Sequence, residues 1–324
     1  MERMRQASIL FLWLAFCIAS QRLLAQPPPG ESWREKRFSV EVFGGLLFFE
    51  PRDLNLRAAY DRAFLDNQLN FSNLYAPAPQ ADTAVGDFLT IGSSFPFGFR
   101  MKFLMNRRWA LSLGFKYMLK DQESTVTARY PDYGARPMIT DYSFSPYSIS
   151  ARGFTPLLGV HYQLWKSRFF DLDLFAAGGP LFADCGYTVG IRRVDFLDGR
   201  AYRADETRYE IEGRSTGIAA EVGIHIKAVV FRSIRVFLEG GYAFQKARDL
   251  NGRGRLDYYR YTGIASRRLS DRLEWEGYWG IKEAVPLAPL PSNEWEKEDP
   301  RVRDFILDLS GAFLRIGISY AFSL

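Results

Sequence analysis

Two histidines, His161 and His225, are the residues of this 324-residue chain best suited to acid–base chemistry. A hydrolase site would combine such a histidine with a serine and an acid. Neither histidine lies in a His-x-Ser pair, and the nearest expected acid is Asp173, whose contact with a histidine is more often a structural hydrogen bond. We therefore expect no catalytic residues and no enzyme activity. A lipid-modifying enzyme is the least favoured alternative.

Residues that could hold a metal are sparse. Cys185 is the one cysteine after the N-terminal apolar stretch, and one cysteine with two histidines on separate segments cannot build a tetrahedral zinc site. Carboxylate pairs such as Glu274 with Glu276 could bind calcium weakly, but such pairs are more often solvated loop charges. The sequence therefore predicts no metal site and no cofactor.

Charged residues alternate with apolar ones along short segments. In "FDLDLFA", Phe170, Leu172 and Leu174 fall on one face of an extended strand, and Asp171 and Asp173 fall on the other. This period of two recurs in eight segments, at residues 38–49, 95–105, 109–119, 154–164, 170–176, 217–228, 234–244 and 314–324. One face of all eight carries no Asp, Glu, Lys, Arg or His.

The opposite face carries the charges, and we predict that they pair inside a closed sheet, because unpaired interior charges would be costly. Three sets of these residues are expected at similar depth on adjoining strands: Glu41 with Arg100 and Lys102, Asp173 with His161, and Asp171 with Lys227. A structural plug is favoured over a path for protons or ions. The predicted interior network comprises Glu41, Arg100, Lys102, Lys116, His161, Asp171, Asp173, Glu221, Lys227, Arg235, Glu239 and Arg315.

Short and long connections alternate between the eight segments. Three short turns lie around Arg107, Lys166 and Arg232, and loops are expected at about residues 50–94, 121–152, 184–215 and 246–308. Such long loops are unusual in a compact soluble domain, and this alternation is typical of an outer-membrane barrel. The predicted fold class is therefore all-β: a membrane-spanning, antiparallel, up-and-down β-barrel of eight strands, with short periplasmic turns and long extracellular loops. A soluble β-sandwich is the alternative.

Two of the expected loops allow a ten-stranded barrel. A hairpin is expected around Asp198-Gly199, and "LDYYRYTGIA" and "LEWEGYWGIK" in the last loop could add strands, although Arg260 on a possible lipid face argues against this. The exposed aromatic residues of the last loop could bind glycans, lipopolysaccharide or a partner protein. We favour the alternative that they pack on one another.

The N-terminus has the features of a secretory signal. Arg3 and Arg5 precede a short apolar stretch, and Ala25 precedes a proline-rich break, so residues 1–25 are predicted as a signal peptide and residues 26–37 as a linker. The barrel then covers residues 38–324. The formal charge of the whole chain is +5, with no dense basic cluster, so no nucleic-acid partner is expected.

The chain ends on "GISYAFSL", in which Gly317, Tyr320 and Phe322 form a pattern of a glycine followed by two aromatic residues two positions apart. This segment resembles the C-terminal signature of bacterial outer-membrane β-barrels, and the overall plan resembles the small eight-stranded OmpA, OmpX and OmpW type. Ser323 and Leu324 depart from it, since many members end on the aromatic residue. The resemblance implies that the barrel-assembly machinery recognises this segment and that the chain resides in the outer membrane of a Gram-negative-type bacterium.

The combined expectation is a non-enzymatic outer-membrane barrel with an envelope-structural role, or a surface-binding role through its extracellular loops. Outer-membrane lipid and lipopolysaccharide would surround it, and any extracellular ligand is unknown. The alternative is a passive transporter or pore for small or apolar solutes. Gly178, Gly179 and Pro180 would then mark a lateral opening.

Overall fold

The structure is a computed structural model, and it describes residues 38–56, 58–59, 61–63, 65, 83–132, 138–167, 169–197, 200–231, 233–262, 266–278, 280–282 and 302–322. The predicted signal peptide and linker lie outside these residues. The described part is almost entirely antiparallel β-sheet, as the sequence predicts. None of its helical residues forms a segment long and apolar enough to cross a membrane as a helix.

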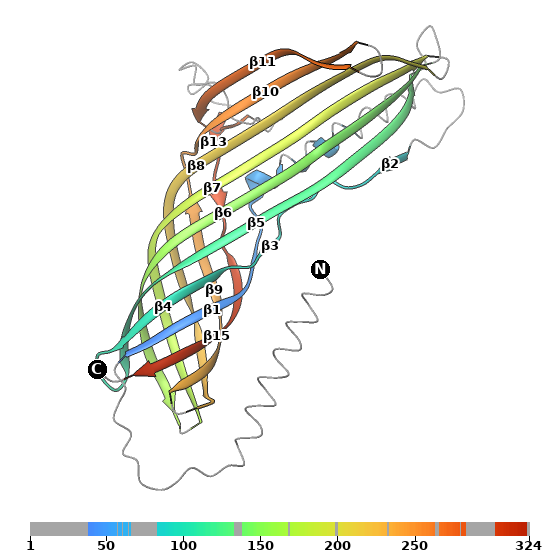
Figure 1. Ribbon diagram of the computed structural model, residues 1–324. Helices are drawn as coiled ribbons and strands as arrows, with labels where there is room; N and C mark the ends of the chain where they lie inside the picture. Colours follow the sequence, from blue (N-terminus) through green and yellow to red (C-terminus); the bar gives the residue numbers. More distant parts are fainter. Residues whose placement is uncertain are drawn as a thin grey trace.

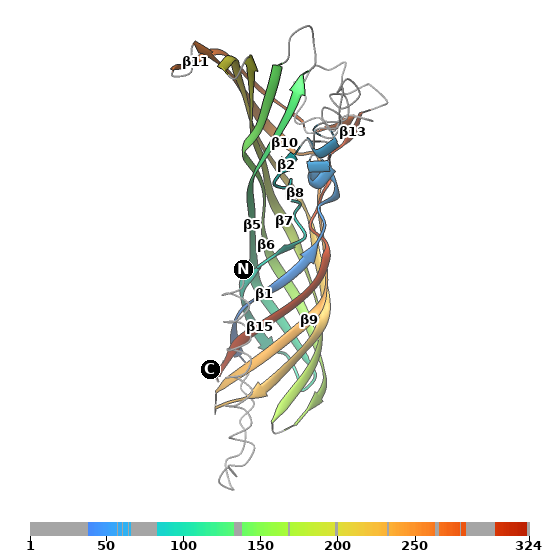
Figure 2. The same cartoon turned by 90° about the vertical axis from the view of Figure 1, so that its right-hand side faces the viewer.

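Eight strands pair in a closed circuit, seen as the lower tube in Figures 1 and 2. The order is β8-β7-β6-β5-β4-β1-β15-β9, and β9 pairs back with β8, so the sheet closes on itself through antiparallel pairs only. The strands are β1 (Phe38–Phe49), β4 (Phe97–Leu104), β5 (Trp109–Asp132), β6 (Met138–Lys166), β7 (Phe170–Leu197), β8 (Arg200–Val229), β9 (Ile234–Ala247) and β15 (Gly311–Phe322).

The whole sheet has 13 strands, so the prediction of eight, or ten, is wrong as a strand count. Five further strands attach to the circuit: β2 (Thr83–Val85), β3 (Ser93–Ser94), β10 (Asn251–Thr262), β11 (Ser266–Tyr278) and β14 (Leu307–Asp308). A separate two-stranded sheet pairs β12 (Gly280–Lys282) with β13 (Val302–Asp304). The strands β10 and β11 do not widen the circuit, because β8 pairs with β9 through residues 217–229 and with β10 through residues 205–214.

The strands β5 to β8 continue far beyond the circuit as a curved wall, which fills the upper half of Figure 1. They contain 24, 29, 28 and 30 residues, whereas β1, β4, β9 and β15 contain 12, 8, 14 and 12. Their pairing extends to Asp132↔Met138 and to Leu197↔Arg200. The described parts of segment 121–152, expected as a loop, are therefore strands. In segment 184–215 the strands on either side of Asp198-Gly199 pair, which confirms the hairpin expected within that loop.

In the wall, successive side chains still alternate between the two faces of the sheet, but the buried apolar residues now point inward and the exposed residues point outward. Along β7, the outward positions are apolar as far as Phe182 and polar from Asp184, while the inward positions change from Asp171 and Asp173 to residues such as Tyr187. A hydrophobic pattern on the outward face therefore ends where the circuit ends. The pattern moves to the inward face, which is why the sequence alone suggested a loop.

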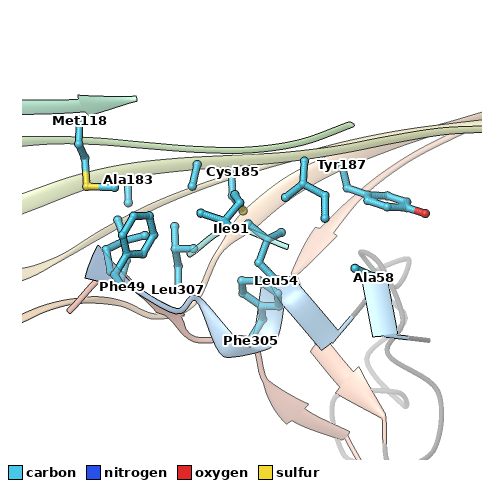
Figure 3. Packing of buried hydrophobic residues seen from close by; sticks show 14 of the residues in the cluster. Phe49, Leu54, Ala58, Ile91, Met118, Ala183, Cys185, Tyr187, Phe305 and Leu307 are labelled. Carbon is cyan, nitrogen blue, oxygen red and sulfur yellow. The ribbon is translucent and has the colours of Figure 1, made fainter. Parts of the chain in front are cut away.

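The inward apolar face of the wall is covered by segments that return over it (Figure 3). Leu54, Ile91, Phe305 and Leu307 from these segments are each 4% exposed or less, against wall residues such as Cys185. Hydrogen bonds hold the cover in place: the Asn55 side chain exchanges two with the backbone of Ile91, and Tyr187 donates one to Asp61 at 2.6 Å. These covering segments therefore form a second layer, which closes the end of the circuit from which the wall extends.

We predict that Leu307→Ala destabilises the protein by about 2–5 kcal/mol, because Leu307 is fully buried and its loss leaves a cavity in the core. Leu273→Ala is the matched control: Leu273 is 57% exposed, so its truncation should change stability by about 0.5 kcal/mol or less. Urea unfolding of the two refolded variants measures both values. Equal effects would show that the cover does not pack on the wall.

Candidate functional site

The charged residues of the circuit lie on its inward face, because they share one parity along each strand. Glu41, Lys116 and Glu239 are fully buried, and Arg315 is 1% exposed. Six cations and five carboxylates meet in this interior, all among the residues named from the sequence. Each strand of the circuit contributes at least one inward polar or charged group, so the site joins the whole ring.

Arg100 of β4 joins the two sides of the interior. Its Nε donates to Glu41 Oε2 of β1 at 2.8 Å, and its Nη2 donates to Glu239 Oε2 of β9 at 2.7 Å. Glu41 and Arg100 face each other in the β1–β4 register, whereas Glu239 comes from across the ring. A bidentate guanidinium suits this bridge because its donors point in two fixed directions.

Arg315 of β15 forms a second bridge. Its two terminal nitrogens lie 2.7 and 2.6 Å from the two carboxylate oxygens of Glu221, and Nη1 also lies 3.1 Å from Glu239. Lys116 pairs with Glu221. Glu239 therefore connects the Arg100 group with the Arg315 group, and the interior forms one continuous network.

The remaining charges lie toward the short-turn end. Lys102 Nζ lies 3.2 Å from Asp173 Oδ2 and 3.0 Å from His161 Nδ1, and Lys227 Nζ lies 3.2 Å from the same Asp173 oxygen. Lys227 also lies 3.5 Å from Glu41. The expected depth of Asp171 and Lys227 is confirmed, since their backbones are in register on adjoining strands. The ion pairs differ from that grouping: Asp171 pairs with Arg235 at 2.6 Å.

Four inward phenylalanines, which the sequence analysis missed, hold the guanidinium groups. Arg100 lies over the rings of Phe43, Phe175 and Phe237, and Arg315 lies 4.0 Å from the centroid of the Phe313 ring. Such cation–π contacts stabilise a charge that has lost its water. The sequence contained the relevant pattern: each of these phenylalanines lies two residues from an inward charged residue on the same strand and therefore also faces inward.

Each of these rings rests on a glycine of a paired strand. A Cβ at Gly98 would lie 2.5 Å from the Phe43 ring, and one at Gly317 would lie 2.4 Å from the Phe237 ring. Both pairs are directly in register. Gly223 and Gly241 make room in the same way for Phe175 and Phe313. Gly317, predicted as part of an assembly signal, therefore also has a packing role.

The two histidines, which lie on separate segments of the sequence, come together in the interior. Ligand atoms of His161, Asp173 and His225 lie within 4.8 Å of one another. However, the ammonium groups of Lys102 and Lys227 already contact Asp173, and Lys102 also contacts His161. Adding a divalent cation beside two lysines would be electrostatically unfavourable, so the residues present fit a metal poorly. The geometry favours an ion-paired core.

Two other features were named from the sequence. Tyr320 and Phe322, the aromatic residues of the C-terminal pattern, lie at the end of β15, where Phe322 stacks on Phe38 with ring centroids 5.9 Å apart. Cys185 is 4% exposed in the apolar core, and burial raises the pKa of its thiol. The thiol is therefore protonated and shielded from reagents.

One groove of about 480 Å³ lies on the outer side, where β1, β9 and β15 reach the end of the circuit. Phe48, Glu50, Thr90, Tyr242 and Ala312 contribute to its lining. None of the interior charged residues lines it, so the groove and the charged network are separate features.

Comparisons with known proteins add little. No protein-family model matches the sequence, and no curated protein is similar to it. Among solved structures, the chain is similar to a major outer membrane protein from Thermus thermophilus, with 10% identity and a TM-score of 0.31 over 88% of this chain and 98% of that one. A similarity at this level supports no conclusion about function, so the function proposed for this chain rests on its own geometry.

We predict that Glu221→Gln destabilises the protein by about 3–5 kcal/mol, because it leaves Lys116 without a carboxylate partner among the described residues. The double variant Glu221→Gln/Lys116→Met should recover part of this loss, since it removes the orphaned ammonium. Asp141→Asn is the control: its partner Arg129 is exposed, so it should cost about 1 kcal/mol or less. Unfolding in detergent tests all three; a double variant no better than Glu221→Gln would contradict the pairing.

Proposed function

We propose that the chain is an outer-membrane β-barrel protein whose closed circuit of eight strands spans the membrane. The observation that carries this proposal is the reversal of polarity along β5 to β8. A soluble sheet would keep its apolar face toward one core. Here the outward face of the circuit is apolar and exposed, with Leu158 at 64%, Ile218 at 70% and Val222 at 57%. The interior behind these residues is charged.

A row of alternating charge crosses four strands at one level and supports a membrane boundary there. Register places Arg152 opposite Asp184, and Asp184 opposite Arg214. Asp121 Oδ1 lies 3.9 Å from Arg152, and Arg214 lies 3.4 Å from Asp184. All four are exposed. Each arginine facing lipid at mid-membrane would cost about 2–4 kcal/mol, and each aspartate somewhat less, so the row belongs in the headgroup region.

The strand length between this row and the short turns fits a membrane. In β5, the outward face is apolar over residues 109–119, which matches the roughly 9–11 residues that a tilted spanning strand needs. Tyr117, Phe154 and Phe182 lie next to the charged row, and Trp109 lies at the other end. Aromatic residues at both ends of the apolar band are typical of barrel girdles.

The filled interior supports a barrel that conducts poorly. Ion pairs block the lumen of the circuit, and the apolar core blocks the wall side. The transporter alternative needed an opening near Gly179. The β6–β7 ladder is interrupted there, yet a Cβ on Gly179 would lie 1.9 Å from the Pro156 carbonyl oxygen, so the strands touch. This contact argues against a lateral opening.

The wall beyond the charged row is the part that we propose serves the cell surface, in an envelope-structural or binding role. It is internally braced: Asp257 accepts hydrogen bonds from Arg255 at 2.5 Å and Arg272 at 2.7 Å, and these hold the pKa of its carboxyl well below its usual range. A braced sheet can present side chains in fixed positions, as binding surfaces require. Lipopolysaccharide and the barrel-assembly machinery remain proposed partners.

Val222→Arg is predicted to reduce stability in lipid by about 2–4 kcal/mol, because Val222 faces outward in the middle of the apolar band. Gln163→Arg is the control on a less exposed position near Asp173, and it should cost less. Folding titrations into lipid vesicles compare the two. Equal tolerance would mean that the outward face does not meet lipid.

Purified protein in planar bilayers should leave the current near the baseline, because buried ion pairs among the described residues occupy the interior of the circuit. The same sample should migrate differently in gels with and without heating, as closed barrels resist detergent. Stable, ohmic, large openings would overturn the closed-barrel proposal and favour the transporter. Recovery of the exported protein as a soluble periplasmic species would overturn the membrane placement itself.

A further inference from the structure

The three short turns of the circuit concentrate the positive charge of the chain. Arg107 and Arg108 lie between β4 and β5. Lys166 ends β6 and Arg168 follows before β7, and Arg232 lies between β8 and β9, with no acidic residue in these turns. Without the predicted signal peptide, which holds three arginines and one glutamate, the chain contains 39 lysines and arginines and 36 acidic residues. Five of these 39 basic residues lie in or beside the three short turns, which hold no acidic residue, so these turns carry a net positive charge.

Backbone hydrogen bonds place the three turns side by side. Gln163 N donates to Arg108 O at 2.7 Å, which joins the first turn to the strand that enters the second. Val229 N donates to Phe169 O at 2.9 Å, which joins the second turn to the strand that enters the third. The described basic side chains of Arg107, Arg108 and Lys166 are exposed. They form one basic arc along the rim.

A collar of exposed aromatic side chains adjoins this arc. Trp109 is 44% exposed, Trp165 60%, Phe169 46% and Phe231 52%. Aromatic residues favour the interface between hydrocarbon and headgroups, and cations just beyond them lie at the level of lipid phosphates.

We propose that the basic arc, defined by Arg107, Arg108 and Lys166, binds the headgroups of anionic phospholipids in the leaflet at the short-turn end. This inference rests on the proposed function, because it requires the circuit to span a bilayer. The arc selects for net negative headgroups over zwitterionic ones. The charged row at the other boundary alternates in sign and has no such preference, so the two ends of the barrel differ.

The experiment reconstitutes the protein into phosphatidylcholine vesicles containing one quarter phosphatidylglycerol, extracts it in mild detergent, and measures retained lipid by native mass spectrometry. The parent should retain phosphatidylglycerol at about two- to fivefold above its share of the vesicle, and less at 0.5 M salt. The variant Arg107→Gln/Arg108→Gln/Lys166→Gln should return to the vesicle ratio. The variant Arg152→Gln/Arg214→Gln/Arg253→Gln removes the same charge from the wall side and should keep the enrichment.

Retention at the vesicle ratio in the parent, or equal loss in both variants, overturns the inference. Binding to purified peptidoglycan that depends on the arc, without lipid enrichment, would assign the arc to a different anionic partner and also overturns it. Vesicle flotation and heat-modifiable migration are recorded for every sample. A parent that fails these insertion tests contradicts the proposed function, whereas an inserted parent without enrichment contradicts only the lipid assignment.

Discussion

The pairing of charges inside a closed ring of strands is the interaction on which the rest of the structure depends. Arg100 and Arg315 both reach Glu239, so charges from strands far apart in the ring satisfy one another. Unpaired, each would carry a desolvation penalty of several kcal/mol. Paired, they fix which strands face each other across the interior. The phenylalanine rings and the glycines beneath them adapt the remaining space to the guanidinium groups.

Closure also determines what the long strands do beyond the ring. Beyond the ends of the short strands β9 and β15, no strand lies opposite the inward face of β5 to β8. Charged side chains on that face would therefore have no partners across the interior. The inward residues become apolar instead, and returning segments cover them. The outward face becomes polar at the Asp184 level. The strands β5 to β8 thus border two different cores: a charged core inside the circuit and an apolar core beneath the wall.

The period-two pattern predicted the eight strand segments of the ring, their apolar outward face and the charged residues behind it. It could not predict partners across the interior: Asp171 faces Lys227 in register, but its side chain reaches Arg235, which depends on the shape of the ring. It misread residues 121–152 as a loop because the apolar face moves inward there, whereas the turn signal at Asp198-Gly199 did predict the pairing of the strands around it. It did not give the distance between His161 and His225, whose ring centroids lie 6.0 Å apart, since strand spacing alone does not give distances through a lumen.

The most direct test of the central claim is an accessibility scan along β8 by spin-label spectroscopy in lipid, from residue 208 to residue 228. The account predicts that outward labels at 218, 220, 222, 224 and 226 collide with oxygen and not with a polar nickel reagent. Inward labels at 219, 221 and 225 should collide with neither, and outward labels at 210, 212 and 214 should meet the nickel reagent. Outward labels between 218 and 226 that meet the polar reagent, or inward labels that do so, would contradict a lipid-facing ring with a filled interior.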